Sequence, residues 1–333
     1  MIETAVENNA LLEVKNLKQY FPVKRDSIFQ PKSYVKAVDD ISFYLQEGET
    51  LSIVGESGCG KSTTGRAILR LEEPTAGEIY YDGNNILELN RKDMRKLRKE
   101  LQIIFQDPFS SLNPRRTIKQ MLNEAMAIQK VVEKEKRLDR MLELLSIVGL
   151  PPEALDRYPH EFSGGQRQRL GIARALAVNP KLIICDEAVS ALDVSIQAQI
   201  LNLLKKLQNQ FKLTFLFISH DLSVVKHISD RVMVMYLGKV VEVADKDSMF
   251  DSPLHPYTKA LISSIPVPDP KVKRERILLK GDVPSPINPP SGCRFHTRCP
   301  FATDKCQTDV PALREITPNH FVSCHFAEEL AQS

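Results

Sequence analysis

Residues 55–62 have the composition and spacing of a loop that binds phosphate. They read Gly-Glu-Ser-Gly-Cys-Gly-Lys-Ser, a pattern in which glycines let backbone N–H groups turn toward phosphate oxygens. Lys61 supplies a point charge for the terminal phosphates, and Ser62 supplies a hydroxyl for magnesium. A β-rich run at 50–54 precedes the loop, and helical periodicity at 63–72 follows it, as such a loop requires. The residues expected to bind ATP and Mg²⁺ here are Gly55, Glu56, Ser57, Gly58, Cys59, Gly60, Lys61, Ser62 and Thr63.

Two acidic residues follow an apolar run later in the chain. The run 182–185 is Leu-Ile-Ile-Cys, and a strand buried on both faces would deliver Asp186 and Glu187 to the edge of a sheet. We expect Asp186 to hold magnesium, directly or through water, and Glu187 to polarise the attacking water as a general base. Solvated acids also end ordinary strands. The position of Asp186, 23 residues after Ser163 (186 minus 163), favours the catalytic interpretation.

Two further polar residues follow predicted strands. His220 comes after the strand 214–219, so we expect it at the same sheet edge as Glu187, in contact with the terminal phosphate. Gln106 closes the run 101–105, where the sheet gives way to a helical segment. We interpret Gln106 as a catalytic residue that also contacts magnesium and couples the sheet to the helical segment. Each has a simpler alternative, since a lone histidine after a strand is often structural and a glutamine at a strand end often meets solvent.

A second helix start has the character of an anion site. The segment Ser163, Gly164, Gly165, Gln166 precedes the helical run 167–176, and free N–H groups with the helix dipole favour an anion there. A simple helix cap is the alternative interpretation. Because the chain already has its own phosphate loop, we predict that this segment binds a nucleotide held by another subunit.

The elements that position these residues follow from periodicity. Residues 11–52 alternate apolar and polar positions, which predicts antiparallel strands around a loop at 24–36. Residues 108–159 are mostly helical, and the helix 130–148 is expected to bury one apolar face. That face comprises Leu138, Met141, Leu142, Leu145 and Val148.

Beyond this helical insert, strands and helices alternate. Helices are expected at 165–178, 194–211 and 222–228, and strands at 182–185, 213–218 and 232–236. Such alternation predicts an α/β fold with a mainly parallel sheet covered by helices on both faces.

Composition bounds the class of protein. The chain has 333 residues, 42% of them hydrophobic, and a net charge of +3, which neither requires nor excludes nucleic acid. The start carries Glu3 and Glu7 instead of a signal peptide, and the apolar runs fall below the roughly 18–20 residues of a membrane span. We therefore expect a cytosolic protein whose membrane role comes through a partner. Residues 253–333 hold 12 of the 21 prolines, so we place a domain boundary at 252.

Four of the six cysteines gather in the last part of the chain. Cys293, Cys299, Cys306 and Cys324 could ligate zinc or an iron–sulfur cluster, since disulfides are less expected in a reducing cytosol. No Cys-x-x-Cys occurs among them, which counts against an ordinary structural zinc site. Four unligated thiols are the remaining alternative. Cys59 and Cys185 lie apart, and we expect them to be inert.

Taken together, residues 11–250 resemble an ATP-binding cassette (ABC) ATPase. The resemblance rests on the phosphate loop, Gln106, the segment 163–166, the run 182–186, the segment Ser190–Asp193 and His220, in that order. It implies a P-loop NTPase fold with a RecA-like core, an antiparallel β-subdomain and the helical insert. It also implies a head-to-tail dimer in which Ser163 and Gly165 close on the partner's γ-phosphate. The family pattern places an aromatic residue under adenine, for which we choose Phe21, with Tyr20 as the neighbour.

The tail resembles the C-terminal extension of ATPases that serve oligopeptide and dipeptide permeases, and the whole chain is similar to the F-type subunits of such systems. The resemblance implies a [4Fe-4S] cluster on the four cysteines, with Zn²⁺ as the alternative. It implies as partners two integral membrane permease subunits, an extracytoplasmic peptide-binding protein and a D-type sister ATPase, with no nucleic acid. The expected organisation is a nucleotide-binding domain at 1–252 and a Cys/Pro-rich extension at 253–333.

The leading hypothesis is therefore the ATP-hydrolysing subunit of a peptide importer at the cytoplasmic face of the cell membrane. Two other classes stay open. One is a soluble ABC ATPase acting on nucleic acid or ribosomes, although such proteins usually carry two cassettes or a long coiled coil. The other is a metal or redox sensor in which the cysteines are the functional part and ATP regulates.

Overall fold

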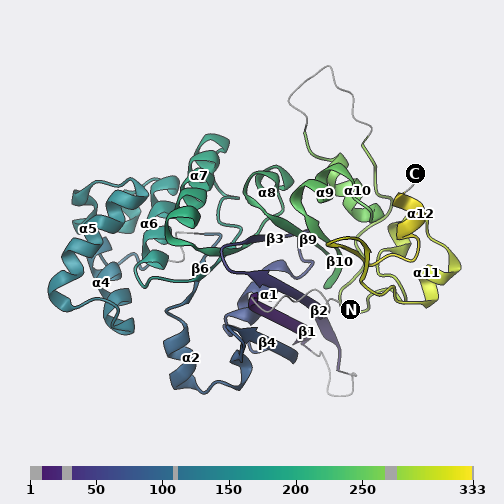
Figure 1. Cartoon of the computed structure of the whole chain (residues 1–333), viewed down its shortest axis with the longest axis horizontal. Coiled ribbons are helices and arrows are strands. Elements are labelled where there is room, and N and C mark those ends of the chain that lie inside the picture. The colour runs from purple at the N-terminus through teal and green to yellow at the C-terminus, as the bar shows by residue number, and fades with distance from the viewer. Residues whose placement is uncertain (1–9, 25–31, 108–111, 267–275, 332–333) are drawn as a thin grey trace. The chain divides into compact units, whose positions relative to one another are not determined.

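The structure is a computed structural model that describes residues 10–24, 32–107, 112–266 and 276–331 (Figure 1). The chain forms two units. The first comprises residues 1–46, 50–87 and 219–333, and the second comprises residues 47–49 and 88–218. Part of the predicted loop at 24–36, and the predicted start of the helical insert at 108, lie outside the described residues.

An antiparallel sheet in the first unit contains the strands predicted between residues 11 and 52. Its order is β2-β1-β4-β5. The strands are β1 (Ala10–Pro22), β2 (Tyr34–Gln46), β4 (Ala76–Tyr81) and β5 (Asn84–Asn85). Strand β1 buries Leu12, Val14 and Leu17, each at most 1% exposed, and an irregularity in the register separates Val14 from Leu17. The antiparallel prediction is confirmed. Strand β2 begins at Tyr34, so the predicted loop extended too far.

A second set of strands in the first unit has the order β11-β12-β10-β9-β3. They are β3 (Thr50–Val54), β9 (Arg231–Tyr236), β10 (Lys239–Asp245), β11 (Arg314–Thr317) and β12 (His320–Val322). Strands β3 and β9 are parallel, whereas β9, β10, β12 and β11 pair antiparallel. Strands from the predicted extension thus share a sheet with β10. The domain boundary at 252 stays a prediction.

Side chains cap the starts of three of the helices described in the first unit. The helices of this unit are α1 (Lys61–Ile68), α8 (Leu222–Ile228), α9 (Lys246–Asp251), α10 (Pro256–Ser263), α11 (Asp304–Thr308) and α12 (Ala327–Ala331). Asp221 caps α8, Asp245 caps α9, and the ring of His255 caps α10 just before Pro256 at the first helical position.

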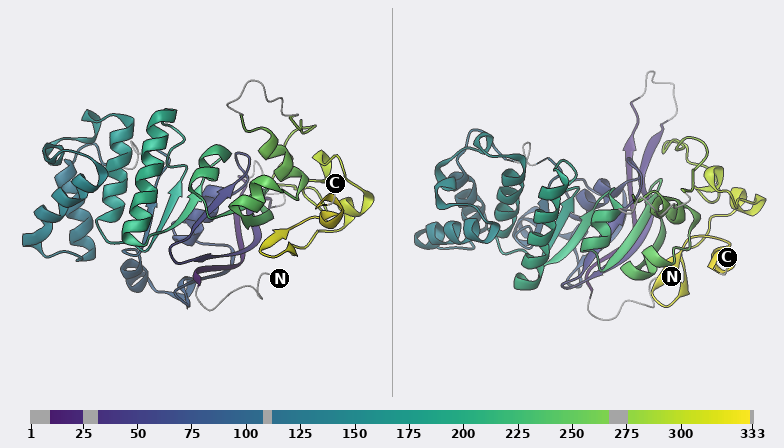
Figure 2. Two further views of the ribbon diagram at one scale, coloured as in Figure 1. Left: turned by 45° about the horizontal axis from the view of Figure 1, so that its top comes forward. Right: turned by 90° about the horizontal axis from the view of Figure 1, so that it is seen from above.

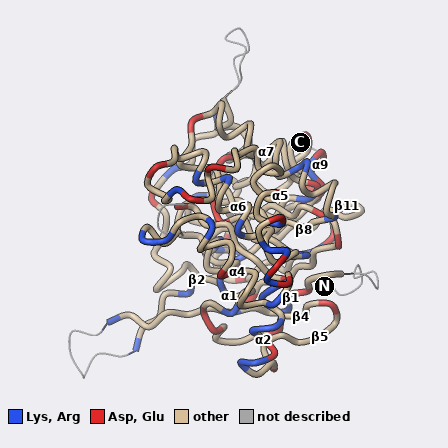
Figure 3. The backbone as a smooth tube through the Cα atoms, turned by 90° about the vertical axis from the view of Figure 1, so that its left-hand side faces the viewer, with Lys and Arg blue, Asp and Glu red and all other residues tan. Residues whose placement is uncertain are grey.

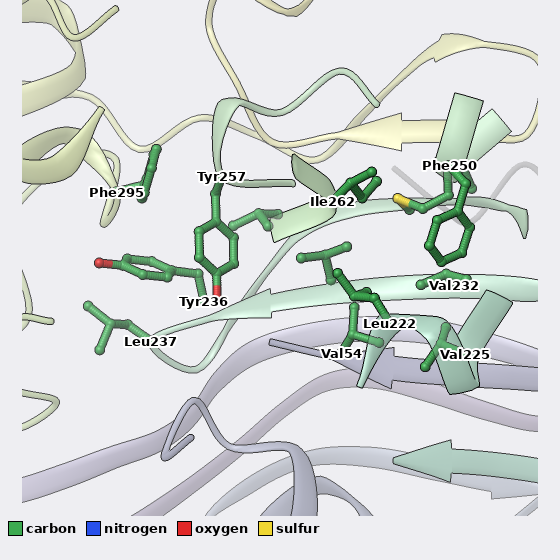
Figure 4. Close-up of a cluster of buried hydrophobic side chains, with 14 residues drawn as sticks. Val54, Leu222, Val225, Val232, Tyr236, Leu237, Phe250, Tyr257, Ile262 and Phe295 are labelled. Atoms are coloured by element: carbon green, nitrogen blue, oxygen red, sulfur yellow. The ribbon is translucent and has the colours of Figure 1, made fainter. Parts of the chain in front are cut away.

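An apolar core joins strands β3 and β9, helices α8 to α10 and the C-terminal part of the first unit (Figure 4). Its largest members are aromatic. Tyr236 from β9, Tyr257 from α10 and Phe295 are each at most 1% exposed, with ring centroids 4.8 to 5.4 Å apart. This packing fixes the position of the segment around Phe295.

The second unit contains three parallel strands in the order β8-β7-β6. They are β6 (Leu101–Ile104), β7 (Leu182–Asp186) and β8 (Thr214–Ile218), and every residue of β7 and β8 is buried. The helices are α2 (Arg91–Leu97), α4 (Ile118–Gln129), α5 (Arg137–Val148), α6 (Gly164–Leu176) and α7 (Val194–Phe211). The predicted parallel strands are thereby confirmed.

Helices α4, α5 and α6 pack against one another (Figure 2). The buried residues of α5 are Met141, Leu144, Leu145 and Val148. Leu138, which we predicted on the buried face, is 46% exposed, and that prediction is wrong. The helix starts only at Arg137, which puts Leu138 in its first turn. Periodicity identifies a face of a helix, but it does not say how far along the helix its neighbours reach.

Charged residues of both signs alternate along the described backbone (Figure 3), in line with the small net charge. None of the helices in the described ranges combines the length and apolar character that a bilayer crossing needs.

Candidate nucleotide site

The phosphate loop, residues 55–62, joins β3 to α1 in the first unit. Two of its glycines are required by close approach of other backbone. A Cβ at Gly55 would lie 2.2 Å from the Met235 carbonyl oxygen, and a Cβ at Gly60 would lie 2.1 Å from the Ala37 carbonyl oxygen. Both also have positive φ angles, of 151° and 105°. The loop is therefore wedged between two other segments of its unit.

Lys61 is folded back over the loop that precedes it. Its ammonium donates to the carbonyl oxygens of Gly55 at 2.9 Å and Glu56 at 3.1 Å, and the residue is only 4% exposed. The positive charge of Lys61 is thus held by the backbone of Gly55 and Glu56, which belongs to the loop expected to surround the phosphates. The position of Lys61 depends on where those two carbonyls are.

The other loop residues divide by exposure. Ser57 and Gly58 are exposed at the tip of the loop, and Ser62 and Thr63 are half-buried in the first turn of α1. Cys59 is buried, and burial raises the pKa of its thiol, so the thiol stays protonated at neutral pH. This agrees with the inert role predicted for Cys59, and Cys185, fully buried, behaves in the same way.

Glu187 and Gln106 meet at the carboxyl ends of two neighbouring strands in the second unit. Ile104 of β6 pairs with Cys185 of β7. Gln106 and Glu187 each lie two positions beyond these paired residues, so they come side by side. The Gln106 amide nitrogen donates to a Glu187 carboxylate oxygen at 2.8 Å. Asp186, directly before, is 4% exposed. The parallel register thus joins two residues that the sequence identified separately.

The backbone of Glu187 has an uncommon conformation. Its φ angle is +49°, in the left-handed region that a residue with a side chain seldom adopts. The conformation is held from both sides, since Glu187 N–H donates to the Ile218 carbonyl at 3.0 Å and the Glu187 carbonyl accepts from Ser190. The carboxylate is half-buried and turned toward Gln106. Backbone strain of this kind is typical of functional positions.

The signature segment, residues 163–166, begins α6 with a reciprocal cap. Ser163 Oγ accepts from Gln166 N–H at 3.4 Å, and the Gln166 side chain accepts from Ser163 N–H at 3.0 Å. The predicted N-cap position of Ser163 is confirmed. Ser163, Gly164 and Gln166 are exposed, and a Cβ at Gly165 would lie 2.6 Å from Ile196 Cγ2. The segment is accessible and tightly seated on α7.

Two predicted contacts belong to the first unit. His220 is exposed and lies two residues beyond the end of β8, next to the α8 cap Asp221. Phe21 is half-buried near the end of β1, opposite Val35. Its neighbour Tyr20 instead donates its hydroxyl to Asp39, and burial together with this bond raises the pKa of Tyr20 to about 12. The roles of His220 and Phe21 stay predictions.

Cysteines 293, 299, 306 and 324 line one pocket in the first unit, together with Phe295, Phe301 and Phe326. The described residues nevertheless contain no group of three or more His, Cys, Asp or Glu side chains arranged to hold a metal ion. Burial raises the pKa of Cys293 and Cys299 to about 11, and a metal that bound them would have to displace their protons. As they stand, the four thiols do not form the ligand set that the resemblance implied.

Two residues that contact the phosphate loop were not predicted from the sequence. Arg298 forms an ion pair with Glu56, and the Tyr257 hydroxyl accepts from Glu56 N–H. Both come from the C-terminal part of the chain, more than 200 residues from the loop. Tyr257 lies within the run His255–Thr258, but its spacing carries no signal for a nucleotide site. Arg298 directly precedes Cys299, and the cysteines of this segment were interpreted as metal ligands.

Comparison with known families separates the chain into two matched regions. The family described as ABC transporter matches residues 38–190, and the family described as oligopeptide/dipeptide transporter, C-terminal region, matches residues 241–306.

Among curated proteins, the chain is similar to the oligopeptide transport ATP-binding protein AppF of Bacillus subtilis. The two are 57% identical over 97% of this chain and 99% of that protein. A putative peptide import ATP-binding protein of Brucella ovis is 52% identical over 94% of this chain and 97% of its own length.

Solved structures with the same fold are also similar. A dimeric ATP-binding cassette in a post-hydrolysis state, bound to ADP and phosphate, has a TM-score of 0.62 and 30% identity, covering 71% of this chain and 98% of that chain. The structure of cbiO1 from Clostridium perfringens, part of an ABC transporter complex, has a TM-score of 0.63 and 27% identity. It covers 73% of this chain and 92% of that chain.

Proposed function

The chain belongs to the ABC transporter ATPases that carry an oligopeptide/dipeptide transporter C-terminal region, and from this premise we propose that it hydrolyses ATP to power peptide uptake. One observation carries the peptide assignment. The identity of 57% to an oligopeptide transport ATP-binding protein extends over 97% of this chain and therefore includes the C-terminal region. An ATPase domain alone would support only the general family.

In the first unit, the phosphate loop is proposed to hold ATP. Lys61 would contact the terminal phosphates, and the folded-back position of its ammonium places it against the loop carbonyls before any phosphate contact. Ser62 would hold magnesium, which when bound neutralises phosphate charge. Phe21 would stack on adenine, and His220 would contact the γ-phosphate, as the sequence predicts.

In the second unit, Glu187 is proposed to act as the general base and Asp186 to bind magnesium. The 2.8 Å bond from Gln106 supports this assignment, because the amide orients the carboxylate without protonating it. Gln106 is also proposed to touch magnesium and to report its state to the helices α4 and α5.

The signature segment is proposed to bind the nucleotide of a partner ATPase. Its exposure supports this, as does the dimer among the similar solved structures. The helix start would favour the γ-phosphate through its N–H groups and dipole. We retain the D-type sister ATPase as the partner.

The transport assignment implies further partners. We propose two integral membrane permease subunits and an extracytoplasmic peptide-binding protein, with this chain at the cytoplasmic face of the membrane. The names of the relatives, which describe peptide import and oligopeptide transport, support these partners.

An iron–sulfur cluster on the four cysteines remains a proposal of its own. Their gathering around one pocket supports it, and binding would require the side chains to rearrange, because no three of them form a ligand set now. Anaerobically purified protein should then contain iron and absorb near about 400 nm. Zinc without colour would favour the zinc alternative, and the absence of both metals would leave four free thiols.

The function is tested by reconstitution with the permease subunits and the binding protein in proteoliposomes. ATP hydrolysis and uptake of a labelled peptide should depend on each other, and Lys61→Ala should abolish both. Purification of this chain with nucleic acid or ribosomes in place of membrane subunits would contradict the proposal and favour the soluble class. Activity governed by redox state without transport would favour the sensor.

A further inference from the structure

Glu56, the second residue of the phosphate loop, is held by the C-terminal region of the same unit. The Arg298 guanidinium donates to both carboxylate oxygens of Glu56, at 2.8 Å and 3.2 Å. The Glu56 backbone N–H donates to the Tyr257 hydroxyl at 2.9 Å. The side chain and the backbone of one loop residue are therefore both fixed by groups outside the loop. A planar, two-point Arg–carboxylate contact defines direction as well as distance.

Arg298 is itself rigidly placed. Its side chain is only 8% exposed and its guanidinium lies 5.9 Å from the centre of the Tyr236 ring. The residue ends a short turn, His296–Arg298, whose backbone returns to Phe295 through the Arg298 N–H at 3.0 Å. Phe295 is 1% exposed and packs on Tyr236 and Tyr257, as Figure 4 shows. The ion pair is thus anchored in the core of the first unit.

Tyr257 reaches the loop from the same core. Its ring is fully buried between Tyr236 and Phe295, and its hydroxyl is the atom that extends toward Glu56. One aromatic cluster therefore supports both contacts. A displacement of Phe295 would move the two groups that hold Glu56.

The two contacts that hold Glu56 also affect the position of Lys61. The Lys61 ammonium is bound to the carbonyls of Gly55 and Glu56, the residues on either side of the peptide bond whose N–H meets Tyr257. Gly55 is also closely approached by the Met235 carbonyl oxygen and the Cys59 sulfur, which a Cβ at Gly55 would meet at 2.2 Å and 2.8 Å. Release of Glu56 would change the direction of both carbonyls and with them the position of the Lys61 charge.

We propose that Arg298 and Tyr257 are positioning residues for ATP binding, which hold Glu56 so that the phosphate loop keeps Lys61 in place. The C-terminal region, whose family match covers residues 241–306, would thereby set the affinity of the ATPase for its nucleotide. The inference rests on the proposed ATPase function, and it adds a role for a region otherwise explained by the cysteines alone.

The test is a double-mutant cycle in the reconstituted full transporter. Arg298→Ala and Glu56→Ala should each raise the KM for ATP by about tenfold, the change expected on loss of a shielded charged hydrogen-bond pair, with a smaller change in kcat. The double variant should be no worse than either single variant. Arg298→Lys should recover part of the loss, because it restores one of the two contact points.

Two further variants separate positioning from folding. Tyr257→Phe removes only the hydroxyl and keeps the aromatic packing, so it should raise the KM with little change in the unfolding midpoint. Glu328→Ala breaks an exposed ion pair with Arg314 in the same region but leaves the Arg314 bond to the Cys324 carbonyl, and it should leave the KM unchanged.

Two outcomes would overturn the inference. One is a KM for ATP within twofold of wild type in Arg298→Lys and Tyr257→Phe, with Arg298→Ala either equally unaffected or failing to fold. The other is equal loss of kcat and of folded protein with unchanged KM, which indicates a structural role. Absence of ATPase activity in the wild-type complex would instead count against the proposed function.

Discussion

Replacement of Glu187 by glutamine tests the chemistry assigned to the second unit. Glutamine has the same shape, can keep the left-handed backbone conformation, and can still accept from Gln106 through its side-chain oxygen. Only the basicity is lost. A positioned general base contributes about 10² to 10⁴ in rate, or about 2.7 to 5.4 kcal/mol of activation free energy. We therefore expect hydrolysis to fall by at least about a hundredfold while ATP affinity stays within about twofold of wild type.

Gln106→Ala is the matched control. It removes the amide that orients Glu187 and that is proposed to touch magnesium, but not the base. Because Gln106 is exposed, loss of its bond to Glu187 alone is expected to cost about 1 kcal/mol, or about fivefold in rate, and a larger loss would report the magnesium contact. The assay is phosphate release by the reconstituted transporter at saturating ATP, with nucleotide binding measured on the same preparations. If Glu187→Gln retains more than about a tenth of the activity, or loses no more than Gln106→Ala does, Glu187 is not the base.

Three other predictions follow from the geometry. Ser163→Arg should block ATP-driven dimer closure and transport while each chain still binds nucleotide, and normal transport by this variant would refute the role in the partner's site. Glu242→Ala should lower the free energy of unfolding by about 3 to 5 kcal/mol. The variant leaves the N–H groups of Leu254 and His255 and the ring of His320 without their buried acceptor. A loss below about 1 kcal/mol in denaturant titration would contradict this expectation. Burial lowers the pKa of His255 from 6.5 to about 4, against the opposing effect of Glu242, so its contribution to stability should be complete above pH 6.5 and be lost as the pH falls toward 4, by up to about 3 kcal/mol. The difference in unfolding midpoint between wild type and His255→Asn, which keeps an oxygen to cap α10, should therefore change across that range, and a constant difference would refute the assignment.

Local patterns predicted the elements whose limits are set within the chain itself. Helices α7 and α8 begin and end where the periodicity placed them, at Val194–Phe211 and Leu222–Ile228. Their ends are local features, such as the Asp221 cap of α8 and the left-handed Lys212 that ends α7. Strands β11 and β12 were not predicted. They are three to four residues long, and β12 is defined by pairing with Glu242 and Val243, nearly 80 residues away.

The same distinction applies to the site. Gln106 and Glu187 were each predicted from a strand that precedes them, and parallel pairing of β6 with β7 brings them together without further information. Their meeting is thus a consequence of strand order. The ion pair between Glu56 and Arg298 has no such origin, since Arg298 ends a short turn whose place is set by aromatic packing. No local period or spacing encodes it.

The cysteines show that composition brings residues to attention but does not predict their packing. Four thiols within 32 positions attract a metal interpretation, yet in this structure they face aromatic side chains and lack ligand geometry. The contact that the same segment does make is through Arg298, the residue before Cys299, and it reaches the phosphate loop. Cys299 directly follows Arg298 at the end of the turn His296–Arg298, so a substitution that displaces this segment is expected to disturb the contact with Glu56. Nucleotide affinity is therefore the property through which a change at the cysteines should first be measured.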